Sequence, residues 1–160
     1  MREKWTPAQA RRAALRLLSR RDHSEQEFRR KLAEKGCDDS VIEALQDDFR
    51  TLGYLNDEAY TERQIRFLAR EKLYGDRRIE GYLLGKGIPR ERIREGMKAL
   101  REEFPEEEAL VMIIRKKMGR HAFVNNDPGK RRLVQSLMGR GFSPERLLET
   151  LERILEEKKA

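Results

Sequence analysis

Few side chains in this sequence have types and spacings that could perform chemistry. The two histidines, His23 and His121, are far apart in the sequence. The single cysteine, Cys37, is not separated from either histidine by a spacing that is typical of metal ligands. Zinc sites need several Cys, His or carboxylate ligands at short spacings, so no metal site is predicted. No serine, cysteine or carboxylate pair is placed beside His23 to indicate nucleophilic or acid–base catalysis. We therefore expect no enzymatic activity and no cofactor.

Structural roles are sufficient to explain these residues. Cys37 occupies a position that is apolar in the rest of the chain's repeated pattern, which predicts a small core side chain. His23 precedes Ser24, a predicted helix cap, and is expected at the surface or in the capping region. The carboxylates alternate with Arg and Lys at helical spacing, which is typical of solvated, ion-paired helix faces.

One segment resembles the phosphate-binding loop G-x-x-x-x-G-K-[ST]. Residues 81–86 read Gly-Tyr-Leu-Leu-Gly-Lys, which is one residue too short. Gly87 stands where a hydroxyl should hold magnesium, and no strand precedes the segment. The segment is therefore predicted to be the end of a helix, and nucleotide binding is not expected.

A fingerprint occurs three times along the chain. Its centre is a basic residue followed by glycine, and apolar residues stand eight and four positions before that glycine and one and six positions after it. The matched sets are Phe28, Leu32, Lys35, Gly36, Cys37 and Ile42; Ile79, Leu83, Lys86, Gly87, Ile88 and Ile93; and Leu133, Leu137, Arg140, Gly141, Phe142 and Leu147. Periodicity on this scale indicates a repeat architecture.

Composition also favours small repeated units over one large core. Of 160 residues, 41% are charged and 38% are hydrophobic. We therefore predict three three-helix repeats, at residues 1–53, 54–104 and 105–160. Units of this size are marginal alone and should stabilise one another by stacking. The long surface of such an array usually binds another macromolecule.

The local patterns are helical throughout. All five prolines stand at expected helix starts, where the missing N–H costs little. Ser24 and Glu27 have capping-box spacing, in which Glu27 would reach back to the cap. No segment alternates as a strand does. We predict an all-α fold, an elongated array of three tandem helix-turn-helix-like bundles, with helices at roughly 7–20, 24–35, 39–52, 57–73, 76–86, 89–103, 105–120, 128–140 and 144–157.

The formal charge of +7 is spread over all three repeats, so the chain has no basic tail. Within the repeats, positive charge concentrates in the first parts of repeats one and three, where it could contact phosphates or an acidic protein surface. These two basic zones are the predicted partner-binding sites. The first zone is Arg20, Arg21, Arg29, Arg30 and Lys31, and the second is Lys116, Lys117, Arg120, Lys130, Arg131 and Arg132.

Three-helix units also suggest DNA-binding helix-turn-helix domains. A recognition helix in repeat one would be its third helix, which carries five acidic residues, Asp38, Asp39, Glu43, Asp47 and Asp48. The DNA backbone would repel this helix, so sequence-specific reading of DNA is not expected.

Cellular location can also be predicted. No stretch approaches the roughly 20 apolar residues of a membrane span, and the first residues lack the apolar run of a signal peptide. A single cysteine cannot form an internal disulfide. We expect a cytoplasmic, monomeric protein that does not bind membranes.

Ordered motifs in all three repeats resemble the RecX proteins, bacterial regulators of the RecA recombinase. The motifs lie in residues 13–32, in the link at 53–57, in residues 74–88 and in residues 140–143. The resemblance runs from about residue 10 to about residue 155. No family motif is recognised in residues 119–127.

The resemblance implies a non-enzymatic helical protein that binds the RecA filament on DNA and restrains its strand exchange and ATPase. A long array lying along a filament could cover bound DNA and gain affinity from several modest, linked contacts. Direct DNA contact is expected to be weak. An independent nucleic-acid-binding repeat protein and a structural helical adaptor are the alternatives.

Overall fold

The computed structural model describes residues 4–120 and 127–160. This part of the chain contains nine α-helices, a short π-helix and no strand, which confirms the all-α prediction. The elements are α1 (Pro7–Arg20), α2 (Glu25–Glu34), α3 (Asp39–Thr51), α4 (Asp57–Arg66), η1 (Phe67–Glu71), α5 (Asp76–Gly85), α6 (Arg90–Glu103), α7 (Glu106–Arg120), α8 (Asp127–Gly139) and α9 (Pro144–Glu157). His121 lies outside the described residues.

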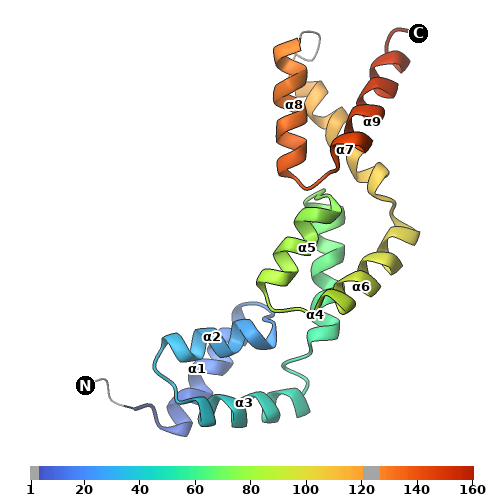
Figure 1. Cartoon of the computed structure of the whole chain (residues 1–160). Coiled ribbons are helices and arrows are strands. Elements are labelled where there is room, and N and C mark those ends of the chain that lie inside the picture. The colour runs from blue at the N-terminus through green and yellow to red at the C-terminus, as the bar shows by residue number, and fades with distance from the viewer. Residues whose placement is uncertain (1–3, 121–126) are drawn as a thin grey trace.

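The helices form an elongated molecule in which three groups follow one another from the N-terminus to the C-terminus (Figure 1). We call α1–α3 repeat 1, α4–α6 with η1 repeat 2, and α7–α9 repeat 3. The divisions predicted after residues 53 and 104 fall between these groups of helices. These residue boundaries stay a prediction.

The repeated fingerprint is a Schellman motif, a helix C-terminus closed by a left-handed glycine. The glycine φ angles are +91° at Gly36, +78° at Gly87 and +93° at Gly141. In each repeat the amide after the glycine donates to the carbonyl of the fingerprint leucine, as the motif requires. The donor and acceptor pairs are Cys37 and Leu32 at 3.1 Å, Ile88 and Leu83 at 3.1 Å, and Phe142 and Leu137 at 3.4 Å. All three leucines are fully buried, as predicted.

Apolar side chains form two separate cores. The core of repeat 1 stands alone and includes Phe28, Leu32 and Phe49. The other core is continuous through repeats 2 and 3, so that Leu83 and Leu137 belong to one cluster. Because apolar burial is the main favourable term in folding, repeats 2 and 3 should behave as one folding unit.

The predicted capping box is wrong, and His23 lies in the capping region, directly before the Ser24 cap, but not at the surface. Ser24 caps α2 by accepting from the Glu27 amide at 3.1 Å, but the Glu27 carboxylate does not complete a capping box. It turns instead to Arg21 and Lys86, because two cations compete for it. His23 is only 3% exposed, and its Nδ1 lies 2.9 Å from the Arg21 carbonyl.

The end of α4 also departs from a regular helix. The chain continues as η1, in which the Lys72 amide donates to the Phe67 carbonyl at 3.2 Å. Leu73 then takes a left-handed conformation, with a φ of +52°. A side chain disfavours this conformation, so burial of Leu73 in the shared core must offset the strain. The kink directs the chain into α5.

Successive repeats are joined by one recurring contact. The N-terminus of α2 meets the glycine turn after α5, and the N-terminus of α5 meets the glycine turn after α8. We call these the first joint and the second joint. As a result, α8, α5 and α2 follow one another head to tail, and we call this row the helix column (Figure 1).

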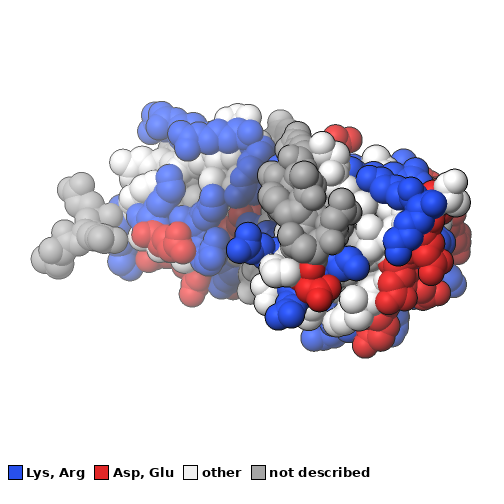
Figure 2. Space-filling view, turned by 90° about the horizontal axis from the view of Figure 1, so that it is seen from above, with Lys and Arg blue, Asp and Glu red and all other residues white. Residues whose placement is uncertain are grey.

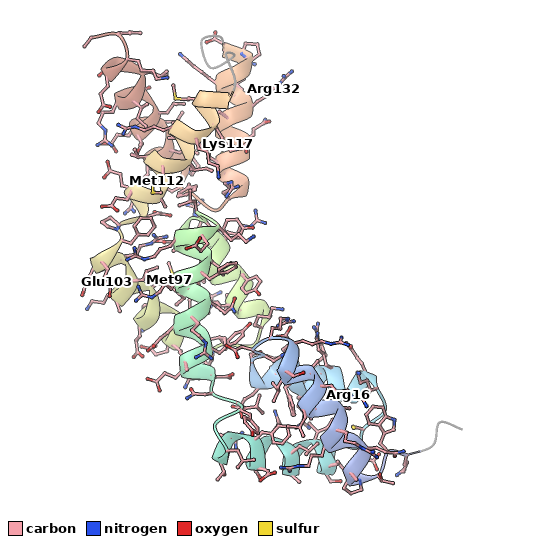
Figure 3. The ribbon with its side chains drawn as sticks, turned by 180° about the vertical axis from the view of Figure 1, so that it is seen from behind. Arg16, Met97, Glu103, Met112, Lys117 and Arg132 are labelled. Carbon is pink, nitrogen blue, oxygen red and sulfur yellow. The ribbon has the colours of Figure 1, made fainter. Side chains whose placement is uncertain are left out.

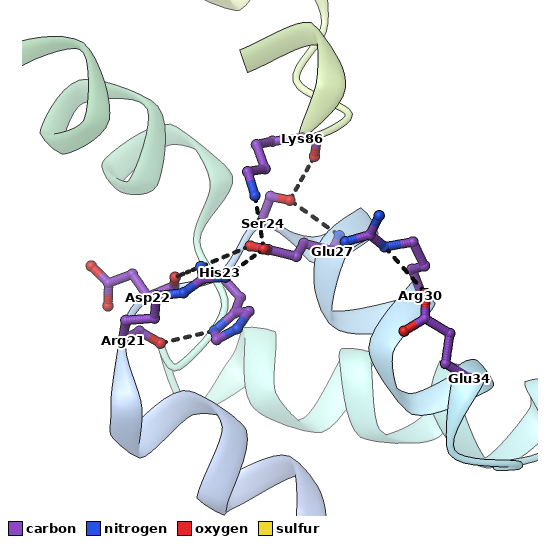
Figure 4. Close-up of polar contacts among 8 residues, drawn as sticks. All are labelled: Arg21, Asp22, His23, Ser24, Glu27, Arg30, Glu34 and Lys86. Carbon is purple, nitrogen blue, oxygen red and sulfur yellow. Dashed lines mark hydrogen bonds and ion pairs between the residues drawn. The ribbon is translucent and has the colours of Figure 1, made fainter. Parts of the chain in front are cut away.

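The first joint is built from side chains (Figure 4). Ser24 Oγ donates to the Lys86 carbonyl at 2.6 Å, and Lys86 Nζ lies 2.9 Å from Glu27 Oε1. The Glu25 amide donates to Asp57 Oδ1 at 2.9 Å. Gln26 packs over Gly87, where an added Cβ would overlap its side chain.

The second joint combines backbone and side-chain contacts. Arg78 donates across it to the Gly139 carbonyl at 3.0 Å, and Arg140 donates to the Lys72 carbonyl at 2.6 Å. The Gly75 amide donates to the Arg140 carbonyl at 2.8 Å, and the Arg77 amide donates to the Gly141 carbonyl at 3.3 Å. A Cβ on Gly75 would lie 2.5 Å from the Gly141 backbone. Both glycines are therefore required by the closeness of the two chain segments.

Candidate partner-binding surface

The structure divides the first predicted basic zone into paired and unpaired side chains. Arg29 contacts the Asp39 carboxylate at 3.1 Å and the Glu43 carboxylate at 3.5 Å. Arg30 faces Glu34 across one helix turn at 3.8 Å, a distance typical of a weak, exposed pair. The acidic α3 therefore neutralises part of the charge on α2.

Arg21 belongs to the first joint. Its guanidinium donates to both oxygens of Glu27, at 2.6 and 3.0 Å, and the Glu27 side chain is only 2% exposed (Figure 4). Burial alone would raise the pKa of the Glu27 carboxyl, but hydrogen bonds from Arg21 and Lys86 outweigh it and lower that pKa to about 2. Glu27 thus stays ionised, and Arg21 already has a buried partner.

Arg20 and Lys31 are the members of this zone that make no ion pair within the described residues. Arg20 continues a row whose other members, Arg12 and Arg16, are absent from the two predicted zones. Arg12, Arg16 and Arg20 stand four residues apart on α1, are exposed, and likewise have no carboxylate partner there. Residues four apart share one helix face, so this spacing could have revealed the row from sequence alone. We call it the α1 arginine row.

The second zone is less paired than the first. Lys116 and Lys117 lie near the end of α7, and Lys130, Arg131 and Arg132 lie in the first turns of α8. Among the described residues none of these five contacts a carboxylate. The side chain of Arg120, also predicted for this zone, lies outside the described part.

A groove beside this zone combines apolar and basic side chains. It lies between α8 and α9, has a volume of about 450 Å³, and is lined by Val134, Leu148, Leu151 and Leu155. Lys130 and Arg131 stand at its edge together with the acidic Asp127 and Glu152. Such a surface suits a protein segment with apolar and acidic side chains better than bare phosphate.

The unpaired cations of the α1 arginine row and of the second zone therefore lie towards opposite ends of the molecule, although exposed cations without an ion pair among the described residues also occur in repeat 2, at Arg77, Arg92 and Lys98. Seen from behind, Lys117 and Arg132 lie at the end formed by α7 and α8, and Arg16 lies at the other end on α1 (Figure 3). Seen from above, Lys and Arg are spread over both the left and the right of the face, and the largest group of Asp and Glu lies at the lower right, with smaller groups elsewhere (Figure 2).

The described residues offer no other candidate site of chemical interest. No group of three His, Cys, Asp or Glu side chains among them could hold a metal ion. Gly81–Lys86, the segment that resembles a phosphate-binding loop, lies at the C-terminal end of α5. No helix in the described part is long and apolar enough to cross a membrane.

Comparison with known proteins identifies relatives over most of the chain. A family model described as "RecX, first three-helix domain" matches residues 10–45. "Regulatory protein RecX" of Thermus thermophilus is 34% identical over 129 residues, which are 81% of this chain and 80% of the relative. The protein of the same name from Prosthecochloris aestuarii is 32% identical over 144 residues, 89% of this chain and 91% of the relative.

Solved structures show the same fold. The crystal structure of RecX from Lactobacillus salivarius superposes with a TM-score of 0.71 at 21% identity, covering 92% of this chain and 95% of that one. A crystal structure of regulatory protein RecX gives a TM-score of 0.75 at 22% identity, covering 91% and 73%.

Proposed function

Because the chain belongs to the RecX family of regulatory proteins, we propose that it binds the RecA filament on DNA and restrains the filament's recombinase and ATPase activities. By this activity it would modulate recombination and DNA repair. It would act as a monomer in the cytoplasm, by lying along the filament and covering the bound DNA.

The observation that supports this proposal most strongly is that two clustered sets of unpaired cations, the α1 arginine row and the basic side chains of α7 and α8, lie towards opposite ends of an elongated array. A filament on DNA presents phosphates and repeated protein surfaces over a long distance. Two separated sites on one chain can engage it together, and the second contact then forms at high effective concentration. Several modest contacts therefore give useful affinity.

The proposed contacts follow from the pairing of the charges. An ion pair offsets the charge of a cation and occupies some of its donors, so an unpaired side chain attracts another anion more strongly than a paired one. The proposed contact residues are Arg12, Arg16, Arg20 and Lys31 towards one end and Lys116, Lys117, Lys130, Arg131 and Arg132 towards the other. Three arginines of the first zone are assigned to ion pairs within repeat 1 instead, namely Arg21, Arg29 and Arg30. Arg120 stays a candidate contact residue.

The direct test is the ATPase activity of RecA on single-stranded DNA while this protein is titrated in. We expect hydrolysis to fall to a plateau at substoichiometric or equimolar protein. Hydrolysis that is unchanged over the whole titration, with correctly folded protein, would contradict the proposed function.

A second candidate function is independent binding of nucleic acid. The α1 arginine row favours it, because a line of cations on one helix face can follow a phosphate backbone. Binding to bare single- or double-stranded DNA should then be as tight as binding to RecA-coated DNA, and should weaken steeply with salt. We expect bare DNA to bind much more weakly than the filament.

A further inference from the structure

The helix column has an end that is constructed like its two joints. The turn after α2, at Lys35 and Gly36, has the same Schellman hydrogen bonds and left-handed glycine as the turns after α5 and α8. Those two turns each receive a helix N-terminus. At Gly36, by contrast, nothing lies within 4 Å of the position that a Cβ would occupy. We propose that this turn, the docking turn, accepts the N-terminus of a helix of the RecA filament that carries an acidic residue in its first turn.

The first part of the recognition is the backbone carbonyl before the glycine. The Lys86 carbonyl accepts from Ser24 Oγ at 2.6 Å, and the Arg140 carbonyl accepts from the Gly75 amide at 2.8 Å. The last carbonyls of a helix lack intrahelical donors, and a helix C-terminus attracts the oppositely polarised N-terminus of another. None of the described groups donates to the Lys35 carbonyl. The docking turn therefore offers a carbonyl acceptor without a donor among the described residues, equivalent to the carbonyls that accept hydrogen bonds at both joints.

The second part is charge. Lys86 Nζ pairs with Glu27, the third residue of α2, at 2.9 Å. Lys35 occupies the position of Lys86 in the fingerprint, is exposed, and has no ion pair within the described residues. An incoming helix with Ser or Thr as its N-cap and Glu or Asp at its third position would reproduce the contacts of the first joint. A first-turn acid also suits the positive end of the incoming helix.

A second copy of this chain fits the docking turn poorly. The helix that would enter is α8, in which Arg132 precedes the fingerprint residue Leu133 as Glu27 precedes Phe28. Arg132 would therefore approach Lys35 with like charge, which is unfavourable. Gly129, at the position of Ser24, is already buried within repeat 3. The occupant is thus expected on a partner of different sequence, and this assignment rests on the proposed function.

Two variants test the docking turn on the RecA filament. In Gly36→Asn, asparagine tolerates the left-handed conformation, but its side chain would fill the space over the turn. The matched control is Gly53→Asn, at another left-handed glycine of repeat 1 with open space around it. In Lys35→Glu, the reversed charge should repel the acidic helix. The control with the same charge change is Lys158→Glu, beyond α9.

The measurement is the protein concentration that half-inhibits RecA ATPase on single-stranded DNA. Each docking-turn variant should need a roughly tenfold higher concentration, whereas both controls keep the wild-type value. The two Gly→Asn variants should lose similar stability, because both glycines have a positive φ, so melting temperatures separate a loss of folding from a loss of binding. If wild type inhibits and both docking-turn variants match it, the docking turn is not used and the inference is wrong. If Gly53→Asn weakens inhibition of RecA ATPase as much as Gly36→Asn does, the effect is not specific to the docking turn and the inference is also wrong.

Two further outcomes separate the possible failures. If wild type itself does not inhibit RecA, the proposed function is wrong, and the proposal that a helix of the RecA filament occupies the docking turn is wrong as well. If wild type self-associates in sedimentation experiments and Gly36→Asn abolishes this association, the occupant is a second copy, and the proposed partner is wrong.

Discussion

The two joints place equivalent helices on equivalent turns, yet they use different interactions. The first joint consists of side-chain hydrogen bonds and ion pairs around Glu27, between two separate apolar cores. The second consists of backbone hydrogen bonds at two glycines and of arginine hydrogen bonds to backbone carbonyls, beside a core that continues across it. Side chains contribute to both joints, but only the second adds close backbone packing and a shared core.

The difference predicts unequal rigidity. Close-packed backbone cannot shift without losing many contacts, whereas side-chain ion pairs can adjust and are weakened by salt or pH. A pocket of about 190 Å³ that is partly open to solvent lies between repeat 1 and α4, and His23 and Tyr60 are among its lining residues. His23 Nε2 has no hydrogen-bond partner among the described residues. Repeat 1 should therefore move as a unit against a rigid body formed by repeats 2 and 3.

The largest effects are expected in the cores. Leu137→Ala and Leu32→Ala each truncate a fully buried side chain and should lower the free energy of unfolding by about 2–5 kcal/mol. Trp5, the single tryptophan, packs against the core of repeat 1, so its fluorescence reports on that repeat. In denaturant titrations, Leu32→Ala should shift the fluorescence transition and Leu137→Ala mainly the circular dichroism transition. If the fluorescence and circular dichroism transitions shift equally in both variants, the three repeats unfold as one cooperative unit, which would contradict the prediction.

The next effect concerns the second joint. In Gly75→Ala, the new Cβ would lie 2.5 Å from the Gly141 backbone, so the joint must open, at a cost of about 1–3 kcal/mol. Gly81→Ala in the same helix has open space and should instead stabilise the protein by about 0.5–1 kcal/mol. Circular dichroism melting of the two variants tests this pair. A Gly75→Ala protein as stable as wild type would show that the joint is looser than described.

A smaller loss is expected at the first joint. Glu27→Gln removes the carboxylate shared by Arg21 and Lys86 and should cost about 1–2 kcal/mol, because Arg21 is half-exposed and can be rehydrated. Glu34→Gln on the same helix affects only an exposed pair and should change stability by less than about 0.5 kcal/mol. Small-angle scattering of Glu27→Gln should also show a broader distribution of shapes. Identical stability and scattering for both variants would argue against a joint built on Glu27.

The smallest effect is the pH dependence of the first joint. Burial lowers the pKa of His23 below its usual 6.5, aided by Arg21 and Lys31, so folding favours the neutral ring. Stability from this group is complete above about pH 6.5 and declines as the pH falls below it. Glu27, with a lowered pKa of about 2, adds a loss that begins near its ordinary pKa of 4.5. Trp5 fluorescence unfolding at pH 7 and pH 5 should differ for wild type and much less for His23→Gln; equal differences would exclude His23 as the cause.

Local rules predict most of the fold. The prolines, caps and left-handed glycines mark the helix ends, and the spacing of the apolar residues identifies buried positions such as Leu32. These features depend on residues close in sequence, which is why one sequence suffices. The π-helix and the left-handed Leu73 were not predictable, because tertiary packing imposes them against local preference.

The candidate surface was less predictable than the fold. Counting charges indicated basic zones, but it could not show that Arg21 is held by Glu27 or Arg29 by Asp39, because these pairs depend on how helices pack. The basic residue before the glycine is a second example. A cation at this position is favoured by its own helix C-terminus, but Lys86 also pairs with Glu27 of the neighbouring repeat, which only the packing of the repeats determines.

The α1 arginine row and the Lys130–Arg132 cluster carry the central claim, that unpaired cations towards both ends of the array hold the filament. The most direct measurement compares RecA ATPase inhibition over a salt series for wild type and three triple variants. The variants replace by Gln the set Arg12, Arg16 and Arg20, the set Lys130, Arg131 and Arg132, or the ion-paired control set Arg66, Arg90 and Arg94.

All three variants lose the same formal charge. Neutralising either unpaired set should weaken inhibition and flatten its salt dependence with little change in melting temperature, while the control stays close to wild type. Identical inhibition curves for wild type and all three variants would contradict the claim.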